Sequence, residues 1–217
     1  MNFAGWREVS MVDYPGKIAL TLFTSGCNFD CPYCHNAELK KKVEHTLKED
    51  TVFDFIDYRR RVYDAIVVTG GEPSLYSSEL IDFLMRLRES FPEKLLKVDT
   101  NGSNPDFIDR LYGVVEFVAL DIKALDYSSF SNTSFYTILE SLEAVKHFLD
   151  YEIRLTMYPP FIKEEDFPKY IKLLEGVKRV AVQQYRPVDS VQPYDMSVLE
   201  HFVKMLKPHV QQAYIKF

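Results

Sequence analysis

The sequence lacks the features of a membrane, secreted or nucleic-acid-binding protein. No apolar run approaches the roughly 18 residues that a transmembrane helix needs, and residues 1–10 lack the apolar core of a signal peptide. The 217 residues include 32 Asp and Glu against 26 Lys and Arg, a net charge of −6, so no basic surface is expected for nucleic acid. We therefore expect a soluble cytoplasmic protein that binds neither membrane nor nucleic acid.

Cysteine is scarce, and the three cysteines stand close together. Cys27, Cys31 and Cys34 form the pattern C-x3-C-x2-C. An odd number of cysteines in a cytosolic chain cannot form a closed set of disulfides, and unrelated core thiols would not cluster in this way. Because thiolates bind soft metal centres, the spacing predicts either a zinc site or an iron–sulfur cluster.

These two kinds of metal centre need different ligands. A structural zinc ion takes four, and His35 could be the fourth, although it directly follows Cys34 and adjacent residues rarely point at one ion. Three cysteines can hold three irons of a cubane cluster and leave the fourth iron open for a small chelating ligand. The sequence favours the cluster, with zinc as the alternative.

Apolar strands alternate with amphipathic helices along the chain. Strands are expected at 17–24, 65–69, 95–100, 114–122, 152–157 and 180–183, with a candidate seventh at 210–217, and helices at 51–61, from 77, from 105, at 132–149, 163–175 and 195–206. Thr51 and Asp54 are spaced as a capping box. Six strand–helix units predict parallel strands with outer helices. Because a closed barrel has eight units, we expect one α/β domain, residues 1–217, built as a partial (β/α)6 barrel. A flat doubly wound sheet is the alternative.

Five of the six strands are followed directly by polar residues or glycines. These clusters are 25–36, Gly70-Gly71-Glu72, Asp99-Thr100, Asp121-Ile122-Lys123 and 183–187. Since function gathers at the carboxyl ends of parallel strands, we expect the five clusters to meet at one rim.

Several of these residues suit a zwitterionic ligand. The Gly70-Gly71 pair would let a ligand touch the backbone, and Glu72 would accept a hydrogen bond from a cationic amine. Lys123, on the same strand face as Asp121, would meet a carboxylate. Arg154 is a charge within an apolar strand, and its burial would require an anionic partner. A tight turn and a surface ion pair would explain the glycines and the Asp121–Lys123 pair without any ligand.

The cysteine pattern with Tyr33 before its last cysteine, followed by Gly70-Gly71-Glu72, resembles the radical S-adenosylmethionine (SAM) enzymes. The resemblance covers nearly the whole chain. It implies that the three cysteines hold a 4Fe–4S cluster, that SAM chelates the open iron, and that Tyr33 and the glycine motif bind SAM. Reduction by one electron would then cleave SAM to methionine and a 5′-deoxyadenosyl radical.

Further segments are similar to one branch of that family, the glycyl-radical-enzyme activases. Residues 34–36, 99–102 and 121–123 carry the likeness. It implies that Asp99, Thr100 and Asp121 bind a monovalent cation beside the SAM carboxylate, which Lys123 contacts; we also assign Arg154 to cofactor binding. Residues 5–7, 12–17 and 183–187 are most similar to activating proteins of anaerobic ribonucleoside-triphosphate reductase.

The sequence thus predicts an activase that works without oxygen and installs a glycyl radical on a partner enzyme, the anaerobic reductase. A flavodoxin or ferredoxin-type donor would supply the electron. With three cysteines in total, no second cluster is expected. A small-molecule radical SAM enzyme of the 7-carboxy-7-deazaguanine synthase type and a non-catalytic zinc-binding module are the alternatives.

Overall fold

A computed structural model describes residues 1–43 and 47–217. Eight strands form one sheet, and two short strands, β1 (Asn2–Phe3) and β4 (Leu47–Lys48), pair separately. The strands of the large sheet are β2 (Gly5–Ser10), β3 (Ala19–Thr24), β5 (Ala65–Gly70), β6 (Leu95–Thr100), β7 (Phe117–Asp121), β8 (Asp150–Thr156), β9 (Arg179–Gln183) and β10 (Gln212–Lys216). The helices are α1 (Glu49–Tyr58), α2 (Ser77–Ser90), α3 (Pro105–Leu111), α4 (Phe135–Val145), α5 (Phe167–Leu173) and α6 (Met196–Leu206), with 3-10 turns at Ala37–Lys40, Pro73–Tyr76 and Glu164–Asp166.

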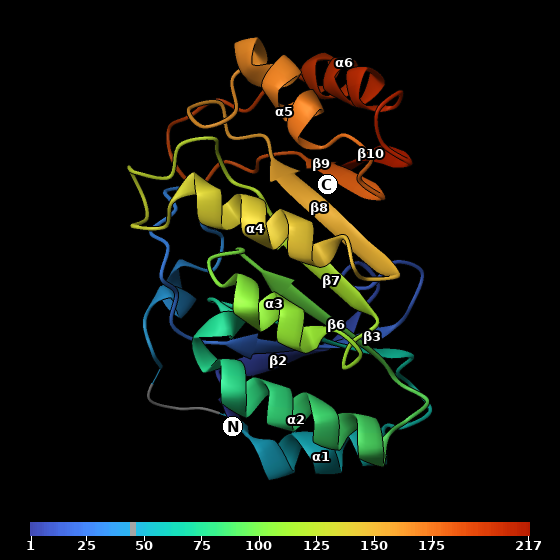
Figure 1. The fold of residues 1–217 in the computed structure, drawn as a ribbon. Helices are drawn as coiled ribbons and strands as arrows, with labels where there is room; N and C mark the ends of the chain where they lie inside the picture. Colours follow the sequence, from blue (N-terminus) through green and yellow to red (C-terminus); the bar gives the residue numbers. More distant parts are fainter. Residues whose placement is uncertain (44–46) are drawn as a thin grey trace.

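The order of the strands decides between the two predicted architectures. From β3 to β10 the large sheet follows chain order, and every neighbouring pair is parallel. A doubly wound sheet would reverse its order at a switch point. Right-handed crossovers in one direction place the helices on one face, where α2, α3 and α4 lie in a row (Figure 1). In the described part of the chain β2 and β10 remain the two edges, so the predicted partial barrel is confirmed, with seven parallel strands because 212–216 pairs with β9.

Strands β1, β2 and β4 were not predicted from the sequence. Strand β2 pairs antiparallel with β3 at the edge of the sheet, and Arg7, Glu8 and Val9 in its middle are exposed. An edge strand that buries little needs no apolar run, so the residue pattern contains no strand signal there.

The predicted capping box at Thr51 and Asp54 is wrong. Helix α1 begins at Glu49, directly after β4, and the amino group of Met1 donates to Glu49 Oε2 at 2.8 Å. Pairing between the N-terminus and β4 therefore fixes the start of this helix, and Thr51 lies inside its first turn. Asn104 caps α3, since its side chain accepts from the Phe107 amide at 3.1 Å, and the predicted start at Pro105 is confirmed.

Helices α2 and α3 begin at the predicted residues, Ser77 and Pro105, whereas α4, α5 and α6 are shorter than predicted. Helix α4 begins after Ser134, whose hydroxyl accepts from the Thr137 amide at 3.2 Å, and a 3-10 turn precedes α5. No helix within residues 1–43 and 47–217 is long and apolar enough to cross a membrane.

Both faces of the central strands are buried. Ile66 and Val68 of β5 belong to the main core, whereas Ala65 and Val67 belong to a smaller cluster with Tyr14. Complete burial of a valine or isoleucine side chain stabilises the fold by about 1.5–3 kcal/mol each. The central strands therefore form a rigid base for the loops at their carboxyl ends.

Candidate active site

A cavity of about 410 Å³ lies at the carboxyl ends of the parallel strands. All of the predicted site residues line it: Cys27, Cys31, Tyr33, Cys34, Gly70, Gly71, Glu72, Asp99, Thr100, Asp121, Lys123 and Arg154. The expectation that the separate clusters meet at one rim is confirmed. Gln183 and Arg186, from the predicted cluster 183–187, line the cavity as well. The cavity also includes residues that were not predicted as site residues, among them Arg7, Asp13 and Asn101.

The cysteine loop leaves β3 and is held by the 3-10 turn at Ala37–Lys40. The amides of Gly26 and Cys27 donate to the carbonyls of Leu39 and Lys40, at 2.8 and 3.0 Å. The Lys40 ammonium in turn donates to the Cys31 carbonyl at 2.9 Å. These bonds fix the backbone on which the three thiols stand.

The three thiols are free and differ in burial. Cys31 is buried, whereas Cys27 and Cys34 are partly exposed. Burial raises the pKa of Cys27 and raises the pKa of Cys31 to about 11, against the lowering effect of the Lys123 charge. Only the thiolate binds metal, so loading of the loop must release protons.

The thiol arrangement bears on the zinc alternative. Within residues 1–43 and 47–217, no group of three or more His, Cys, Asp and Glu side chains could hold a metal ion together. A structural zinc site needs four ligands around one ion. Three thiols on one loop, lining a cavity that also exposes a polar rim, fit a cluster with an open iron better.

The two glycines after β5 let this strand approach the cysteine loop. The amides of Gly71 and Glu72 donate to the carbonyls of Thr24 and Gly26, at 2.9 and 2.8 Å. A Cβ at Gly70 would lie 2.3 Å from the Thr24 oxygen, and one at Gly71 would lie 2.0 Å from the Gly26 oxygen. The two glycines are thus needed for the close packing of β5 against the backbone of the cysteine loop, whether or not a ligand also contacts them.

Glu72 ties the ends of β5 and β6 together. It is 1% exposed, and its carboxylate accepts from the Ser74 amide, the Thr100 hydroxyl and the Asn101 amide at 2.7–2.9 Å. Burial raises the pKa of Glu72, and the donors partly offset that rise. Three bonds to the protein already position the carboxylate, so its contact with a ligand amine stays a prediction.

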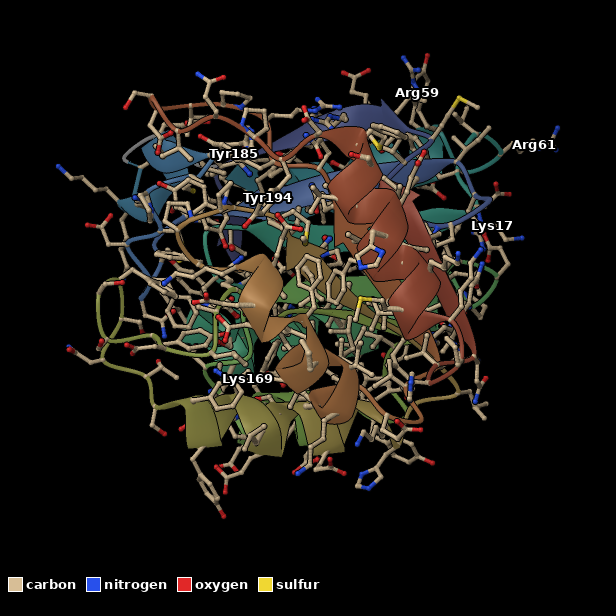
Figure 2. All side chains as sticks on the ribbon, turned by 90° about the horizontal axis from the view of Figure 1, so that it is seen from above. Lys17, Arg59, Arg61, Lys169, Tyr185 and Tyr194 are labelled. Atoms are coloured by element: carbon tan, nitrogen blue, oxygen red, sulfur yellow. The ribbon has the colours of Figure 1, made fainter. Side chains whose placement is uncertain are left out.

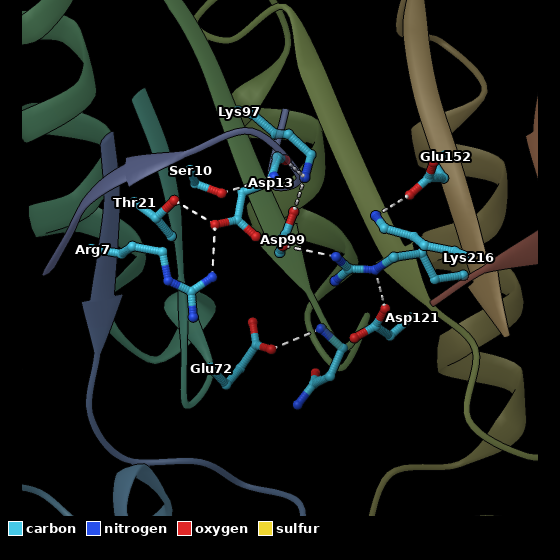
Figure 3. Close-up of polar contacts among 12 residues, drawn as sticks. Arg7, Ser10, Asp13, Thr21, Glu72, Lys97, Asp99, Asp121, Glu152 and Lys216 are labelled. Atoms are coloured by element: carbon cyan, nitrogen blue, oxygen red, sulfur yellow. Dashed lines mark hydrogen bonds and ion pairs between the residues drawn. The ribbon is translucent and has the colours of Figure 1, made fainter. Parts of the chain in front are cut away.

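Ionic side chains form a second wall of the cavity (Figure 3). The Arg154 guanidinium bridges two carboxylates, with Nε 2.5 Å from Asp121 Oδ1 and Nη1 2.8 Å from Asp99 Oδ2. Lys123 Nζ lies 3.1 Å from Asp121 Oδ2, and Lys97 Nζ lies 2.7 Å from Asp99 Oδ1. The predicted anionic partner of Arg154 is confirmed, and there are two.

The charges in this network do not cancel. Three cations face two carboxylates, which leaves one positive charge among five largely buried groups. The cations hold the pKa of both Asp99 and Asp121 below the ordinary range despite burial, and Asp121 raises the pKa of Lys123. Lys97 does not line the cavity, whereas Lys123 and Arg154 do. These two cationic side chains are donors that suit an anionic group such as a carboxylate.

The same contacts give less support to a monovalent cation at Asp99, Thr100 and Asp121. The guanidinium already bridges the two carboxylates, and the Thr100 hydroxyl donates to Glu72. A bridging cation would have to displace Arg154 or share the remaining lone pairs. The residues present therefore do not form a ready cation site, and cation binding stays a prediction.

Lys97 is the main residue that the sequence analysis missed. It lies two residues before Asp99 on one face of β6, its side chain is 1% exposed, and its ammonium also donates to the Asp13 carbonyl at 2.5 Å. A lysine inside an apolar strand gives the same signal that singled out Arg154, and it would have identified this residue.

Tyr33 lines the cavity and packs in a cluster with two other tyrosines. Its ring centroid lies 4.8 Å from that of Tyr158 and 6.4 Å from that of Tyr185. Both of these tyrosines donate to Asp189, at 2.8 and 2.7 Å. Tyr185 lies inside the outline of the molecule in Figure 2, whereas Arg59, Arg61 and Lys17 project at its margin. The buried Tyr33 hydroxyl has no hydrogen-bond partner among the described residues, so it is free to meet a polar group.

Comparison with known proteins decides the family. The family model described as the radical SAM superfamily matches residues 21–174, which include the cysteine loop, the glycine motif and the ionic wall. The chain belongs to the radical SAM superfamily. The predicted resemblance is thereby confirmed, and with it the 4Fe–4S cluster and SAM as the cofactors that this family implies.

Two relatives show the branch that this radical SAM protein is similar to. It is 31% identical to a candidate glycyl-radical enzyme activating enzyme of Methanocaldococcus jannaschii, over 94% of this chain and 85% of the relative. It is 28% identical to the pyruvate formate-lyase-activating enzyme of Listeria monocytogenes, over 88% of this chain and 84% of that enzyme. These relatives confirm the prediction of an enzyme of the activating type.

Solved structures support the fold. The structure of anSMEcpe with bound AdoMet matches with a TM-score of 0.61 at 15% identity, covering 87% of this chain and 60% of that one. Archaeal TYW1 matches with a TM-score of 0.57 at 15% identity, covering 88% and 72%. At such low identity these likenesses establish the architecture alone.

Proposed function

We propose that this radical SAM protein is an activase that installs a glycyl radical on a partner enzyme, and that the partner is anaerobic ribonucleoside-triphosphate reductase. The observation that carries the proposal is the convergence of three thiols, a glycine turn and a wall of paired ionic side chains on one cavity. The names of the relatives at 31% and 28% identity support an activase. A flavodoxin or ferredoxin-type protein would supply the electron.

Different residues of the cavity would bind the cluster and SAM. Cys27, Cys31 and Cys34 would hold the 4Fe–4S cluster, and Tyr33 with the Gly70-Gly71-Glu72 turn would hold the methionyl end of SAM. When bound, the cluster and SAM would supply the chemistry of this family, a one-electron reductive cleavage of SAM to methionine and a 5′-deoxyadenosyl radical. Lys123 and Arg154 would orient the SAM carboxylate, because both cationic side chains line the cavity. This wall gives less support to the predicted monovalent cation.

The choice of partner depends on the N-terminal segment. The residues that resemble activators of the anaerobic reductase include Arg7 and Asp13, and both line the cavity. Arg7 Nη1 lies 3.5 Å from Asp13 Oδ2, which also accepts from the Thr21 hydroxyl at 2.7 Å. The segment thus contributes to the site itself, where a partner's glycine would have to enter.

The small-molecule alternative has weaker support. The 7-carboxy-7-deazaguanine synthase of Methanothermobacter thermautotrophicus is 29% identical over only 52% of this chain and 45% of that enzyme. The activating enzymes match along most of both chains. The comparisons therefore do not favour a deazaguanine synthase.

A glycyl radical on the reductase is the expected product. Reconstituted protein mixed anaerobically with the reductase, SAM and dithionite should give the doublet of a glycyl radical in electron paramagnetic resonance. A reductase variant with alanine in place of the radical-bearing glycine is the control and should give none. If the protein cleaves SAM but the wild-type reductase shows no doublet, the assignment of this partner is wrong.

A further inference from the structure

A second hollow adjoins the cysteine loop. A groove of about 580 Å³ is lined by residues of that loop, by Lys40 and Lys41, and by the loop at 128–132. Cys27 and Phe29 line both this groove and the cavity. The cysteine loop is therefore a shared wall, and the groove reaches Cys27 without passing through the cavity.

The groove lies beside a basic stretch on an acidic protein. Lys40, Lys41 and Lys42 are consecutive, while the whole chain has a net charge of −6. Lys40 is occupied, because its ammonium pairs with Asp30 at 2.5 Å and bonds the Cys31 carbonyl. Lys41 and Lys42 are exposed, and the Lys42 ammonium lies 5.6 Å from the centre of the Tyr76 ring. Two lysines thus present their charge to solvent at the edge of the cysteine loop.

We propose that this groove, with Lys41 and Lys42, is the docking surface for a small acidic protein that delivers one electron. The inference rests on the proposed function, in which a cluster held by Cys27, Cys31 and Cys34 accepts that electron. The cluster is reduced by one electron and the carrier protein is oxidised by one, and no bond or proton changes at this step. Glycine binding in the cavity would not compete with docking at the groove.

The character of the surface fits this kind of partner. Electron-transfer complexes are small and short-lived, commonly burying less than about 1,200 Å² in total. Complementary charge speeds their encounter by about 10- to 1,000-fold, and salt weakens the effect. A groove lined by exposed Lys41, with exposed Lys42 next in the chain, meets these needs, whereas a permanent partner would require a larger apolar contact.

Charge reversal tests the docking surface. The variant Lys41→Glu/Lys42→Glu and wild type are reconstituted with cluster and reduced by a flavodoxin in its hydroquinone form at low salt, and the loss of cluster absorbance is followed by stopped flow. We expect the second-order rate of the variant to fall at least about tenfold. The variant Lys204→Glu/Lys207→Glu makes the same charge change at the end of α6, on exposed lysines outside both hollows, and should keep the wild-type rate.

Two further measurements separate docking from loss of function. SAM affinity and SAM cleavage driven by dithionite, which needs no docking, should be unchanged in the Lys41→Glu/Lys42→Glu variant. Carbodiimide should cross-link the flavodoxin to Lys41 or Lys42 in wild type. Equal rates in variant and wild type, equal losses in both lysine pairs, or cross-links to the reductase at these lysines would overturn the inference. Failure of wild type to cleave SAM with dithionite would instead overturn the proposed function, and the inference with it.

Discussion

The variant Arg154→Gln is expected to have a lower free energy of unfolding than wild type at neutral pH, and the difference should be smaller in acid. Removal of the guanidinium leaves two carboxylates, Asp99 and Asp121, with only one lysine each. Removing one partner from a buried ion pair costs about 3–5 kcal/mol. SAM affinity should fall as well, because the wall loses a guanidinium proposed to orient the SAM carboxylate.

The pH dependence follows from the two carboxylates. Their pKa values are lowered in the folded protein, so in wild type their stabilising contribution is present above about pH 4, the ordinary carboxyl pKa. That contribution is lost as the pH falls from there toward the folded pKa. Without Arg154 much of the lowering disappears, and the difference between wild type and variant should shrink below pH 4.

Denaturant unfolding at pH 7 and at about pH 3, below the ordinary carboxyl pKa, measures this difference. Lys169→Gln is the control, because the Lys169–Asp166 pair is exposed at the surface and its loss should change little. The variant Arg154→Lys keeps one charge but not the two-pronged contact, so it should fall between Gln and wild type. A loss of stability that is the same at both pH values would show that the ionic wall does not act in this way.

The variant Gly71→Ala is expected to lose most of its cluster after reconstitution. The new Cβ would lie 2.0 Å from the Gly26 oxygen and 2.8 Å from the Leu39 oxygen, and both atoms belong to the backbone. Since Gly26 directly precedes Cys27 and Leu39 braces the loop, relief of the clash must move the cysteine loop. Overpacking of this kind costs about 1–3 kcal/mol of stability in addition.

Iron and sulfide content after anaerobic reconstitution measures the cluster. The matched control is Gly5→Ala, because a Cβ at Gly5 meets nothing within 4 Å, and it should load like wild type. Full iron content in Gly71→Ala would mean that the close approach of β5 does not hold the cysteine loop in place.

Much of the site could be predicted because its residues follow strands. The cysteine pattern, the Gly70-Gly71-Glu72 turn and Asp121-Ile122-Lys123 are short and contiguous, and parallel strands carry their carboxyl ends to one edge. Any protein with six such strands in series would bring these clusters together. Predicting that these residues meet therefore required only the order of the strands, and the repeat of strands and helices in the sequence indicates that order.

What could not be predicted depends on contacts between distant segments. The start of α1 is set by the N-terminus through Met1 and Glu49, and β2 is recognisable only by its pairing with β3. The two carboxylates bridged by Arg154 come from β6 and β7, while Arg154 lies on β8. Sequence spacing contains no information on which charges meet across a sheet. An anionic partner could therefore be predicted for Arg154, but not which residues provide it.

Formation of 5′-deoxyadenosine is the measurement that tests the central claim most directly. Anaerobically reconstituted protein is incubated with SAM and dithionite beside the variant Cys34→Ser, and the nucleoside is quantified by chromatography. The account predicts product from wild type and none above background from the variant, because one iron loses its thiolate ligand. No product from wild type, with one tightly bound zinc and no iron, would contradict the account and make the cysteine loop a structural metal site.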